Sequence, residues 1–351
     1  MRILTITKRQ TSKKDLITDR FGRYFHLPHE WSLLGSDCMV LAADYREESI
    51  GETYVDSCRF VNLPLSWRRA ISYWAEIEER ARDFRPDIVF SGGDTHLGWI
   101  GRRLAHRLNV PFIFDVFDNY ESFSSARIPG MKRLFHSLAE DADLTVVVTG
   151  MLADLLGIAD RVCVVPNGVD MDLFRPVKRD VQKPGFRRIA YAGGLAESRG
   201  TSTLVSAIDL LRGAEQDILL VAAGPYLDGF KFPDREWIDY RGIVGQEEVA
   251  GILGAADVAV LPYPDTNWAR YTSAYKLREY LACEVPVVVT DISDYRALAA
   301  TREAVCRPED PEDMARALEF QLRYRVIVER DESWSWRSRA SVLLRELEKL
   351  A

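Results

Sequence analysis

The chain has 351 residues, of which 47% are hydrophobic and 28% are charged. This length can bury one very large core or two ordinary ones, and the usual size of domains favours two. With 53 acidic side chains against 46 basic ones, the net charge is -7. That charge argues against a general nucleic-acid binder, which normally carries a basic excess.

The cysteines and the amino terminus point to a reducing, cytoplasmic setting. The five cysteines are widely separated, and neither a CxxC pair nor a histidine spacing of a zinc site accompanies them. The opening residues MRILTIT form a short strand-like run followed by charged residues, unlike the apolar segment of a signal peptide. No run approaches the roughly 18 to 20 apolar residues of a membrane span. We therefore expect a soluble cytoplasmic protein without a metal site.

The first half of the chain alternates short apolar runs with longer amphipathic stretches, a pattern typical of βα units on a parallel sheet. The predicted strands are 2–7, 38–43, 59–63, 87–91, 111–116, 144–149 and 161–165. The predicted helices are 66–83, 95–108 and 129–141. The sequence therefore predicts a doubly wound α/β domain over residues 1–178.

A second series of the same kind begins after PVKRDVQKPG (176–185), which is predicted to be a linker because it is charged and holds two prolines and a glycine. The predicted strands are 188–192, 217–222, 238–241, 258–261, 285–290 and 304–306. The predicted helices are 201–212, 246–255, 275–282 and 311–324, and a last one covers 335–350. The second domain is predicted over 186–330, with a closing helical segment over 331–351.

Two segments of the second domain carry candidate binding residues at the ends of strands, where open parallel sheets bind ligands. AGGLAESRG (192–200) joins a strand to a helix, so its glycines permit close approach and Arg199 adds a positive charge beside the helix start. TSAYKLREY (272–280) places Lys276 and Glu279 on one face of a helix. The lysine suits a phosphate and the glutamate suits ribose hydroxyls. A plain structural turn and an exposed ion pair are the respective alternatives.

Several segments together resemble the glycosyltransferases of family 4, which have the two-domain GT-B fold. The matching pieces, in order, are ADLTVVVTGMLADLL, VVPNGVDMDLFRP, YAGGLAESRG, LLVAAGP, IDYRGIVGQEEVAGILGAADVAVLPY and TSAYKLREYLACEVPVVVT. They cover essentially all of the second half and the last third of the first half. The resemblance implies two Rossmann-like domains with a cleft between them, and a closing helix that returns to pack on the first domain.

The resemblance also implies a retaining glycosyltransferase, of hexosyltransferase type, that uses a UDP- or GDP-linked sugar and needs neither metal nor another cofactor. The implied catalytic residues are Asp118, Arg199 and Lys276. The implied donor-binding residues are Gly193, Gly194, Arg199, Arg241, Gly242, Ile243, Thr272, Ser273, Ala274, Lys276, Leu277 and Glu279. Arg241 to Ile243 would lie beside the base, and Glu279 would bind the ribose.

Two positions depart from the family pattern. Arg199 stands where the family usually has the lysine of a basic pair, but Gly194 stands where the arginine of that pair would be. Glu279 matches the second of two family glutamates, whereas Tyr271 replaces the first, and tyrosine carries no negative charge at neutral pH. Asn167 and Gly168 form a turn that either packs the domain junction or contacts ligand.

The first domain would bind the acceptor, and its signals are weaker. Its first strand is followed by a basic loop with Lys8, Arg9, Lys13 and Lys14, which either meets a phosphate or a membrane surface or is simply solvated. Asp118 in FDNYESF is the match for a polar group near the reacting sugar, with an Asx-type turn as the alternative. The loop SGGD (91–94) is a weaker candidate.

The expected partners are a nucleotide-sugar donor and a glycan or lipid-linked acceptor, in cell-surface polysaccharide biosynthesis, without nucleic acid. Peripheral contact with the inner face of a membrane is a further expectation for the basic loop and for SWRRAISYW (66–74), which otherwise forms a buried helix. Two other functions remain open because of Gly194 and Tyr271. They are an inert GT-B protein that binds nucleotide sugars and a sugar-nucleotide epimerase.

Overall fold

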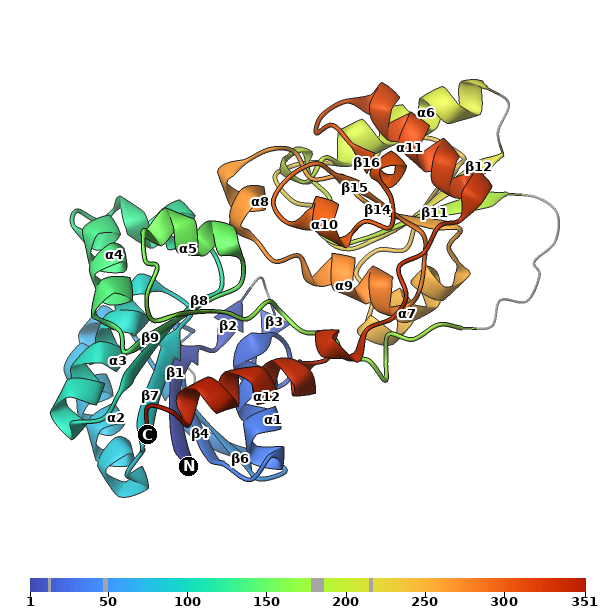
Figure 1. Ribbon diagram of the computed structural model, residues 1–351. Helices are drawn as coiled ribbons and strands as arrows, with labels where there is room; N and C mark the ends of the chain where they lie inside the picture. The colour runs from blue at the N-terminus through green and yellow to red at the C-terminus, as the bar shows by residue number, and fades with distance from the viewer. Residues whose placement is uncertain (12–13, 47–49, 178–185, 215–216) are drawn as a thin grey trace. The chain divides into compact units, whose positions relative to one another are not determined.

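The computed structural model describes residues 1–11, 14–46, 50–177, 186–214 and 217–351, which form two compact units (Figure 1). Unit 1 comprises Met1–Gly168, Tyr271–Ser273 and Trp336–Ala351. Unit 2 comprises Val169–Arg270 and Ala274–Ser335. Each unit thus combines segments that are far apart in the sequence. Residues 178–185, which make up most of the predicted linker, lie outside the described residues.

Unit 1 is built on an eight-stranded sheet in the order β10-β9-β8-β7-β1-β4-β6-β5. Its strands are β1 (Arg2–Lys8), β4 (Asp37–Asp44), β5 (Gly51–Val55), β6 (Cys58–Pro64), β7 (Ile88–Gly92), β8 (Phe112–Val116), β9 (Leu144–Val147) and β10 (Val162–Val164). Neighbouring strands are parallel except β5, which pairs antiparallel with β6. The short strands β2 (Gln10–Thr11) and β3 (Lys14–Asp15) pair separately.

Helices cover both faces of this sheet. They are α1 (Arg23–Leu33), α2 (Ala70–Phe84), α3 (Thr95–Leu108), α4 (Met131–Asp141), α5 (Gly150–Leu156) and α12 (Trp336–Leu347). Figure 1 shows α2, α3 and α4 on one face and α1 with α12 on the other. The Trp31 indole N–H donates to the carbonyl of Ala340 at 3.0 Å, which fixes α12 against α1. The closing helix is therefore part of unit 1.

Helix α3 shows how local sequence sets the bounds of an element, and it covers the predicted range. The Asp94 carboxylate accepts a hydrogen bond from the Thr95 N–H at the start of the helix. Asn109 ends it in the left-handed conformation, with φ of 55°, which asparagine tolerates better than most residues. Between them, Leu97 and Leu104 are fully buried against the sheet. The two capping residues and the apolar stripe thus indicate the same bounds for α3.

A buried ion pair lies within unit 1. The Arg23 guanidinium donates to Asp115 Oδ1 at 2.8 Å, and the two side chains are 1% and 0% exposed. Arg23 also donates to the carbonyl of Val165 and to Asn167 Oδ1, both at 3.1 Å. Burial raises the pKa of Asp115, although Arg23 acts in the opposite direction. The pair therefore ties helix α1 to strand β8 and to the segment after β10.

Unit 2 is built on a fully parallel six-stranded sheet in the order β13-β12-β11-β14-β15-β16. Its strands are β11 (Arg187–Ala192), β12 (Ile218–Ala223), β13 (Ile238–Tyr240), β14 (Val258–Leu261), β15 (Val287–Thr290) and β16 (Val305–Cys306). This is the doubly wound order, in which the winding direction reverses between β11 and β14. The reversal marks where the sheet is expected to bind a ligand.

The helices associated with unit 2 are α6 (Thr201–Gly213), α7 (Gln246–Ala255), α8 (Asn267–Tyr271), α9 (Tyr275–Ala282), α10 (Tyr295–Leu298) and α11 (Pro311–Tyr324). In Figure 1, α6 and α11 lie on one face of the sheet and α7 and α9 on the other. Among the described helices of both units, none has the length and apolar character needed to cross a membrane.

Candidate functional site

The loops that follow β11, β12 and β13 are joined to one another through glycines. The Gly193 N–H donates to the carbonyl of Ala223, and the Gly224 N–H donates to the carbonyl of Gly242, both at 2.7 Å. Gly224 has φ of 132°, and a Cβ there would lie 1.9 Å from the carbonyl oxygen of Gly193. Glycine is thus required at 224. The carboxyl edge of the sheet therefore holds its backbone in one fixed arrangement.

Lys276, in the first turn of α9, lies against the first of these loops. A Cβ built on Gly193 would lie 1.8 Å from the Lys276 Cε and 2.8 Å from its Nζ, so the end of this side chain lies directly against Gly193. The same helix is fixed to the end of β11, because the Tyr280 hydroxyl accepts from the Ala192 N–H at 3.0 Å. The structure therefore brings two predicted residues, Gly193 and Lys276, into contact.

Arg199 lies in the short 3-10 turn Glu197–Arg199 that precedes α6. Its guanidinium carbon is 3.3 Å from the centroid of the Trp268 ring in α8 and 5.8 Å from that of Tyr263. Within the described part of the chain, neither Arg199 nor Lys276 is ion paired or hydrogen bonded through its side chain. Among the described residues, neither of these two cations therefore forms an ion pair at this edge.

The space beside Gly194, where a side chain would extend, is occupied by a neighbouring apolar side chain and not by a charged one. Its carbonyl accepts a hydrogen bond from the Tyr191 hydroxyl at 2.9 Å. A Cβ at 194 would lie 2.6 Å from the Leu227 Cδ1, so leucine occupies the space into which a side chain would extend. Leu227 therefore lies where the side chain of the family's basic residue would begin.

Glu279 lies three residues after Lys276 and is partly exposed. Burial raises the pKa of its carboxyl group, and the nearby Lys276 ammonium acts in the opposite direction. Among the described residues, no hydrogen bond or ion pair occupies the carboxylate. A carboxylate in this position can accept hydrogen bonds from hydroxyl groups.

The remaining predicted donor residues of unit 2 divide into exposed and buried ones. Arg241 is exposed and donates to Asp239 at 2.6 Å, while Ile243 is 74% exposed. Leu277 is 1% exposed and belongs to the core, and Ala274 is 9% exposed. The residues after β13 are thus accessible to a ligand, whereas the Leu277 side chain packs against its own unit.

Thr272 and Ser273 belong to unit 1, whereas the other predicted donor residues belong to unit 2. Ser273 is 2% exposed, and its hydroxyl accepts from the Asn167 N–H at 3.3 Å. Its carbonyl accepts from the Asn167 side-chain amide at 3.0 Å. In this structure Ser273 therefore has a packing role, and Asn167 connects it to the Arg23–Asp115 pair.

The carboxyl edge of the unit 1 sheet gathers a second polar cluster around Lys8. The ammonium group of Lys8 lies 4.8 Å from the Phe123 ring centroid and 5.7 Å from that of Phe117. Burial lowers the pKa of Lys8, and the carboxylates of Asp94 and Asp118 act in the opposite direction. The structure thus places the predicted Asp118 near the end of β1, in the charge environment of Lys8.

Asp118 also has a local role. It is 9% exposed, and its Oδ1 accepts from the Asn119 N–H at 2.8 Å. The Asx turn belongs to Asn119, whose side chain accepts from the Glu121 N–H at 3.0 Å. This segment therefore does form an Asx turn, but the residue that makes it is Asn119 and not Asp118.

The other cations of the basic loop are Arg9, which is ion paired, Lys14, and Lys13, which lies outside the described residues. Arg9 forms ion pairs with Asp15 at 2.8 Å and with Asp44 at 3.2 Å. Lys13 lies outside the described residues, and Lys14 is in β3. Asp94 of SGGD caps α3. Among the described cations of this loop, Lys8 is the one whose charge interacts with Asp118.

Two family models match the chain in succession. Glycosyltransferase Family 4 matches residues 25–173, and Glycosyl transferases group 1 matches residues 186–323. Together they span most of both units. The chain belongs to this glycosyltransferase family.

Among curated relatives, the chain is similar to the GDP-mannose-dependent alpha-(1-6)-phosphatidylinositol dimannoside mannosyltransferase of Mycobacterium tuberculosis, with 27% identity over 232 residues. The match covers 61% of this chain and 59% of the relative. Among solved structures, it is similar to sucrose-phosphate synthase of Thermosynechococcus elongatus, with a TM-score of 0.74 and 16% identity. HepE of Anabaena, solved with UDP-glucose, gives 0.73 and 13%. Both comparisons cover 100% of each chain and confirm the GT-B fold.

Among the residues that the structure describes, no group of three or more histidine, cysteine, aspartate or glutamate side chains could hold a metal ion. The DMD sequence at 170–172 forms a turn, in which Asp170 Oδ1 accepts from the backbone N–H groups of Asp172 and Leu173.

Sequence reasoning missed Trp268 and Arg23. Trp268 lies in a short helix between a proline-rich loop and α9, and a tryptophan in so polar a segment was the available signal. The signal for Arg23 was the aspartate inside the apolar strand FIFDV, because a buried carboxylate needs a cation. Neither signal names the partner, since the partners are far apart in the sequence.

Proposed function

We propose that the protein is a retaining, metal-independent glycosyltransferase that moves a hexose from a UDP- or GDP-linked sugar to an acceptor. Two cations, Arg199 and Lys276, carry this proposal. Both lie at the carboxyl edge of the unit 2 sheet, and neither forms an ion pair with a carboxylate among the described residues. A diphosphate is the natural ligand for two such cations beside glycine-rich loops.

In this mechanism the departing nucleoside diphosphate gains negative charge as the sugar leaves. Arg199 and Lys276 stabilise that charge, because fixed positive groups lower the barrier where charge develops. Glu279 accepts hydrogen bonds from ribose hydroxyls, and the exposed residues from Arg241 to Ile243 lie beside the base. The leaving phosphate itself takes the acceptor proton, so no separate protein base is required. On the acceptor side, Asp118 with Lys8 positions the attacking group.

For the acceptor we propose a glycan or lipid-linked molecule of the cell surface, handled in the cytoplasm. The mycobacterial relative is named for a phosphatidylinositol dimannoside, which supports a lipid-linked class. Polysaccharide or glycolipid biosynthesis would follow. An inert nucleotide-sugar-binding protein and a sugar-nucleotide epimerase are the alternatives.

Thermal stability against UDP- and GDP-sugars tests the donor, because a ligand that binds only the folded state raises the melting temperature. We expect one donor class to raise it, and the same donor to be consumed with an acceptor from a cell-surface glycan or lipid extract. Proton NMR of the product should show the donor's anomeric configuration. Donor binding without any product would support the inert protein, and isomerisation of the donor without acceptor would support the epimerase. Binding of no nucleotide sugar would contradict all three.

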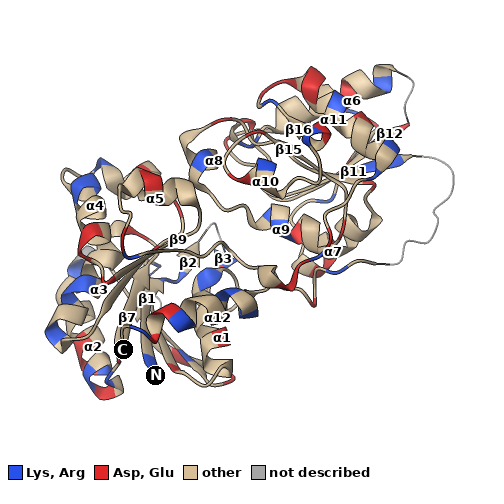
Figure 2. Cartoon of the chain, viewed as in Figure 1, with Lys and Arg blue, Asp and Glu red and all other residues tan. Residues whose placement is uncertain are grey.

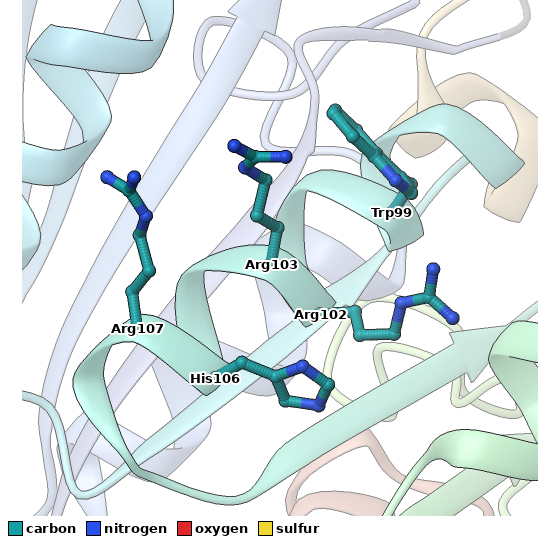
Figure 3. Close-up of a pocket in the computed structure, with 5 residues that line it drawn as sticks. All are labelled: Trp99, Arg102, Arg103, His106 and Arg107. Carbon is teal, nitrogen blue, oxygen red and sulfur yellow. The ribbon is translucent and has the colours of Figure 1, made fainter.

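We also propose that unit 1 contacts the inner face of an anionic membrane through α3. In the cartoon of Figure 2 the positions of basic residues along this helix are blue, and Figure 3 shows five side chains of α3 that line a surface hollow of about 450 Å³. They are Trp99, Arg102, Arg103, His106 and Arg107. Arg103 lies between two indoles, 5.3 Å from the Trp74 centroid and 5.6 Å from that of Trp99. Aromatic rings interleaved with cations suit the headgroup level of a bilayer.

Arg103 is the cation on which this contact depends most. Arg102 and Arg107 are paired with Asp141 and Glu78, whereas Arg103 has no carboxylate partner in the described part of the chain. Arg103→Ala should weaken binding to phosphatidylserine vesicles about fivefold, since a basic residue near the surface contributes about 1 kcal/mol. Sedimentation with the vesicles measures this. Arg323→Ala is the matched control, because Arg323 also lies over an aromatic ring, on α11 of unit 2. Equal vesicle binding by both variants would contradict the contact.

A further inference from the structure

The guanidinium of Arg199 is stacked face to face on the indole of Trp268. Its central carbon lies 3.3 Å from the ring centroid. Each guanidinium nitrogen is about 1.3 Å from that carbon, the length of a C–N bond with double-bond character. If the group stood on edge, a nitrogen would penetrate the ring, so the two planes must be nearly parallel. The N–H donors of Arg199 therefore point parallel to the plane of the indole, where two oxygens of a phosphate can accept two of them.

The segment that carries Trp268 is braced by its own contacts. Asp265 and Arg270 form a two-pronged ion pair, at 2.5 and 2.8 Å, across the turn that contains Trp268. The Ala269 N–H donates to the Thr266 hydroxyl at 3.2 Å. The Trp268 ring also meets Tyr263 edge to face, with centroids 5.1 Å apart. The indole is thus held by several contacts within its own unit, and the arginine side chain lies against it.

Arg199 has few other restraints on its head group. In the described part of the chain its guanidinium makes no hydrogen bond or ion pair, and the residue is partly exposed at the end of a one-turn element. A free arginine side chain samples many rotamers, and a ligand that binds it must stop that motion. Stacking on Trp268 stops it beforehand. The ligand then meets a cation that is already oriented.

We propose that Trp268 is a positioning residue that holds Arg199 ready for the diphosphate of the donor. The inference rests on the proposed function and deepens it, because it names the residue that prepares the diphosphate-binding cation. Its contribution should concern the diphosphate and not the nucleoside, since Trp268 acts through Arg199 alone. The expected gain in diphosphate affinity is about threefold to thirtyfold, the range of a partly buried cation–π contact.

Calorimetric titration with UDP, GDP, the matching nucleosides and inorganic pyrophosphate tests this role. Trp268→Leu should raise the Kd of the preferred nucleoside diphosphate and of pyrophosphate by that factor and leave the nucleoside unchanged. Trp268→Phe keeps a flat ring and should restore most of the affinity. In the Arg199→Ala background, Trp268→Leu should have no further effect, because the two residues act as one unit. Tyr324→Leu is the matched control, since it removes the ring under Arg323 on the same unit.

The outcomes separate the inference from the function on which it rests. A wild-type protein that binds no nucleoside diphosphate would overturn the proposed function and this inference together. Normal wild-type binding with the same Kd in Trp268→Leu, or equal losses for nucleoside and diphosphate, would overturn the inference alone. If Trp268→Leu does not fold, Trp268→Met replaces it, because methionine also lacks a flat ring. Its diphosphate Kd should be raised with the nucleoside Kd unchanged, and a wild-type diphosphate Kd would contradict the role.

Discussion

Glu279→Gln is expected to weaken binding of the nucleotide-sugar donor about 10- to 100-fold. Hydrogen bonds to charged groups contribute about 1.5 to 3 kcal/mol, and each 1.4 kcal/mol is tenfold in affinity. The glutamine keeps the shape of the side chain but loses the charge and one acceptor, so ribose hydroxyls are held less tightly. Because the Glu279 carboxylate makes no hydrogen bond among the described residues, the fold should remain intact. Calorimetric titration with the donor found by thermal stability measures the loss.

The pH dependence of donor binding provides an independent check on Glu279. Burial raises the pKa of this carboxyl above the ordinary value of 4.5. The ribose hydroxyls need the ionised form as an acceptor, so donor affinity of the wild-type protein should fall as pH decreases through the raised pKa. In Glu279→Gln that step should disappear, because an amide does not titrate.

Glu247→Gln is the matched control for both measurements. Glu247 is an exposed glutamate in the first turn of α7, in the same unit, and its replacement should change neither the Kd nor the pH profile. If Glu279→Gln bound the donor as the wild type does, the ribose role would be lost even though the protein could still bind the diphosphate.

The helices and strands with a clear period could be predicted from sequence, and most of unit 2 is of this kind. Helices α3, α7, α9 and α11 occupy the predicted ranges, since each has an apolar stripe bounded by caps or strand residues. The resemblance also named Lys276 before its position was known. What it did not supply is that the lysine side chain lies over Gly193, because a close approach of two segments leaves no local signal.

Elements without boundary signals escaped prediction. Helix α1 has Pro28 in its interior and starts after Gly22 without a side-chain cap, so nothing local marks it as a helix. Strand β5 is mostly exposed and exists because it pairs with β6. The Arg199–Trp268 stack and the Arg23–Asp115 pair were missed for a related reason. Each joins residues that are distant in the sequence, and tertiary structure alone chooses the partner.

Arg23→Met is expected to lower the free energy of unfolding of unit 1 by about 3 to 5 kcal/mol. Removing one partner of a buried ion pair leaves the other charge in the interior without compensation, and costs of this size follow. Asp115 is fully buried, and its second carboxylate oxygen has no hydrogen-bond partner among the described residues. Urea denaturation, with hydrogen exchange of β8 peptides to report on unit 1, measures the loss. Arg2→Met, which breaks the exposed pair with Asp37 at 3.7 Å, should cost no more than about 0.5 kcal/mol.

The cost of Arg23→Met should depend on pH in a defined direction. Burial already raises the pKa of Asp115 above 3.8, and loss of the arginine raises it further. The unfolded chain ionises at the ordinary value, so stability of the variant falls as pH rises from there through the raised pKa. The destabilisation should therefore be smallest in acid and largest near neutral pH. A loss that does not vary with pH would mean that packing, and not the stranded carboxylate, is responsible.

The double variant Arg23→Met with Asp115→Leu separates stability from positioning. It removes both charges, so it should recover much of the stability lost in Arg23→Met, since apolar groups often replace a buried ion pair at little cost. It should not restore the hydrogen bond that Arg23 donates to Asn167, which in turn holds Ser273 just before α9. A stable double variant with weakened donor binding would show that the pair serves to place this segment. Wild-type donor binding in that variant would instead limit the pair to the packing of unit 1.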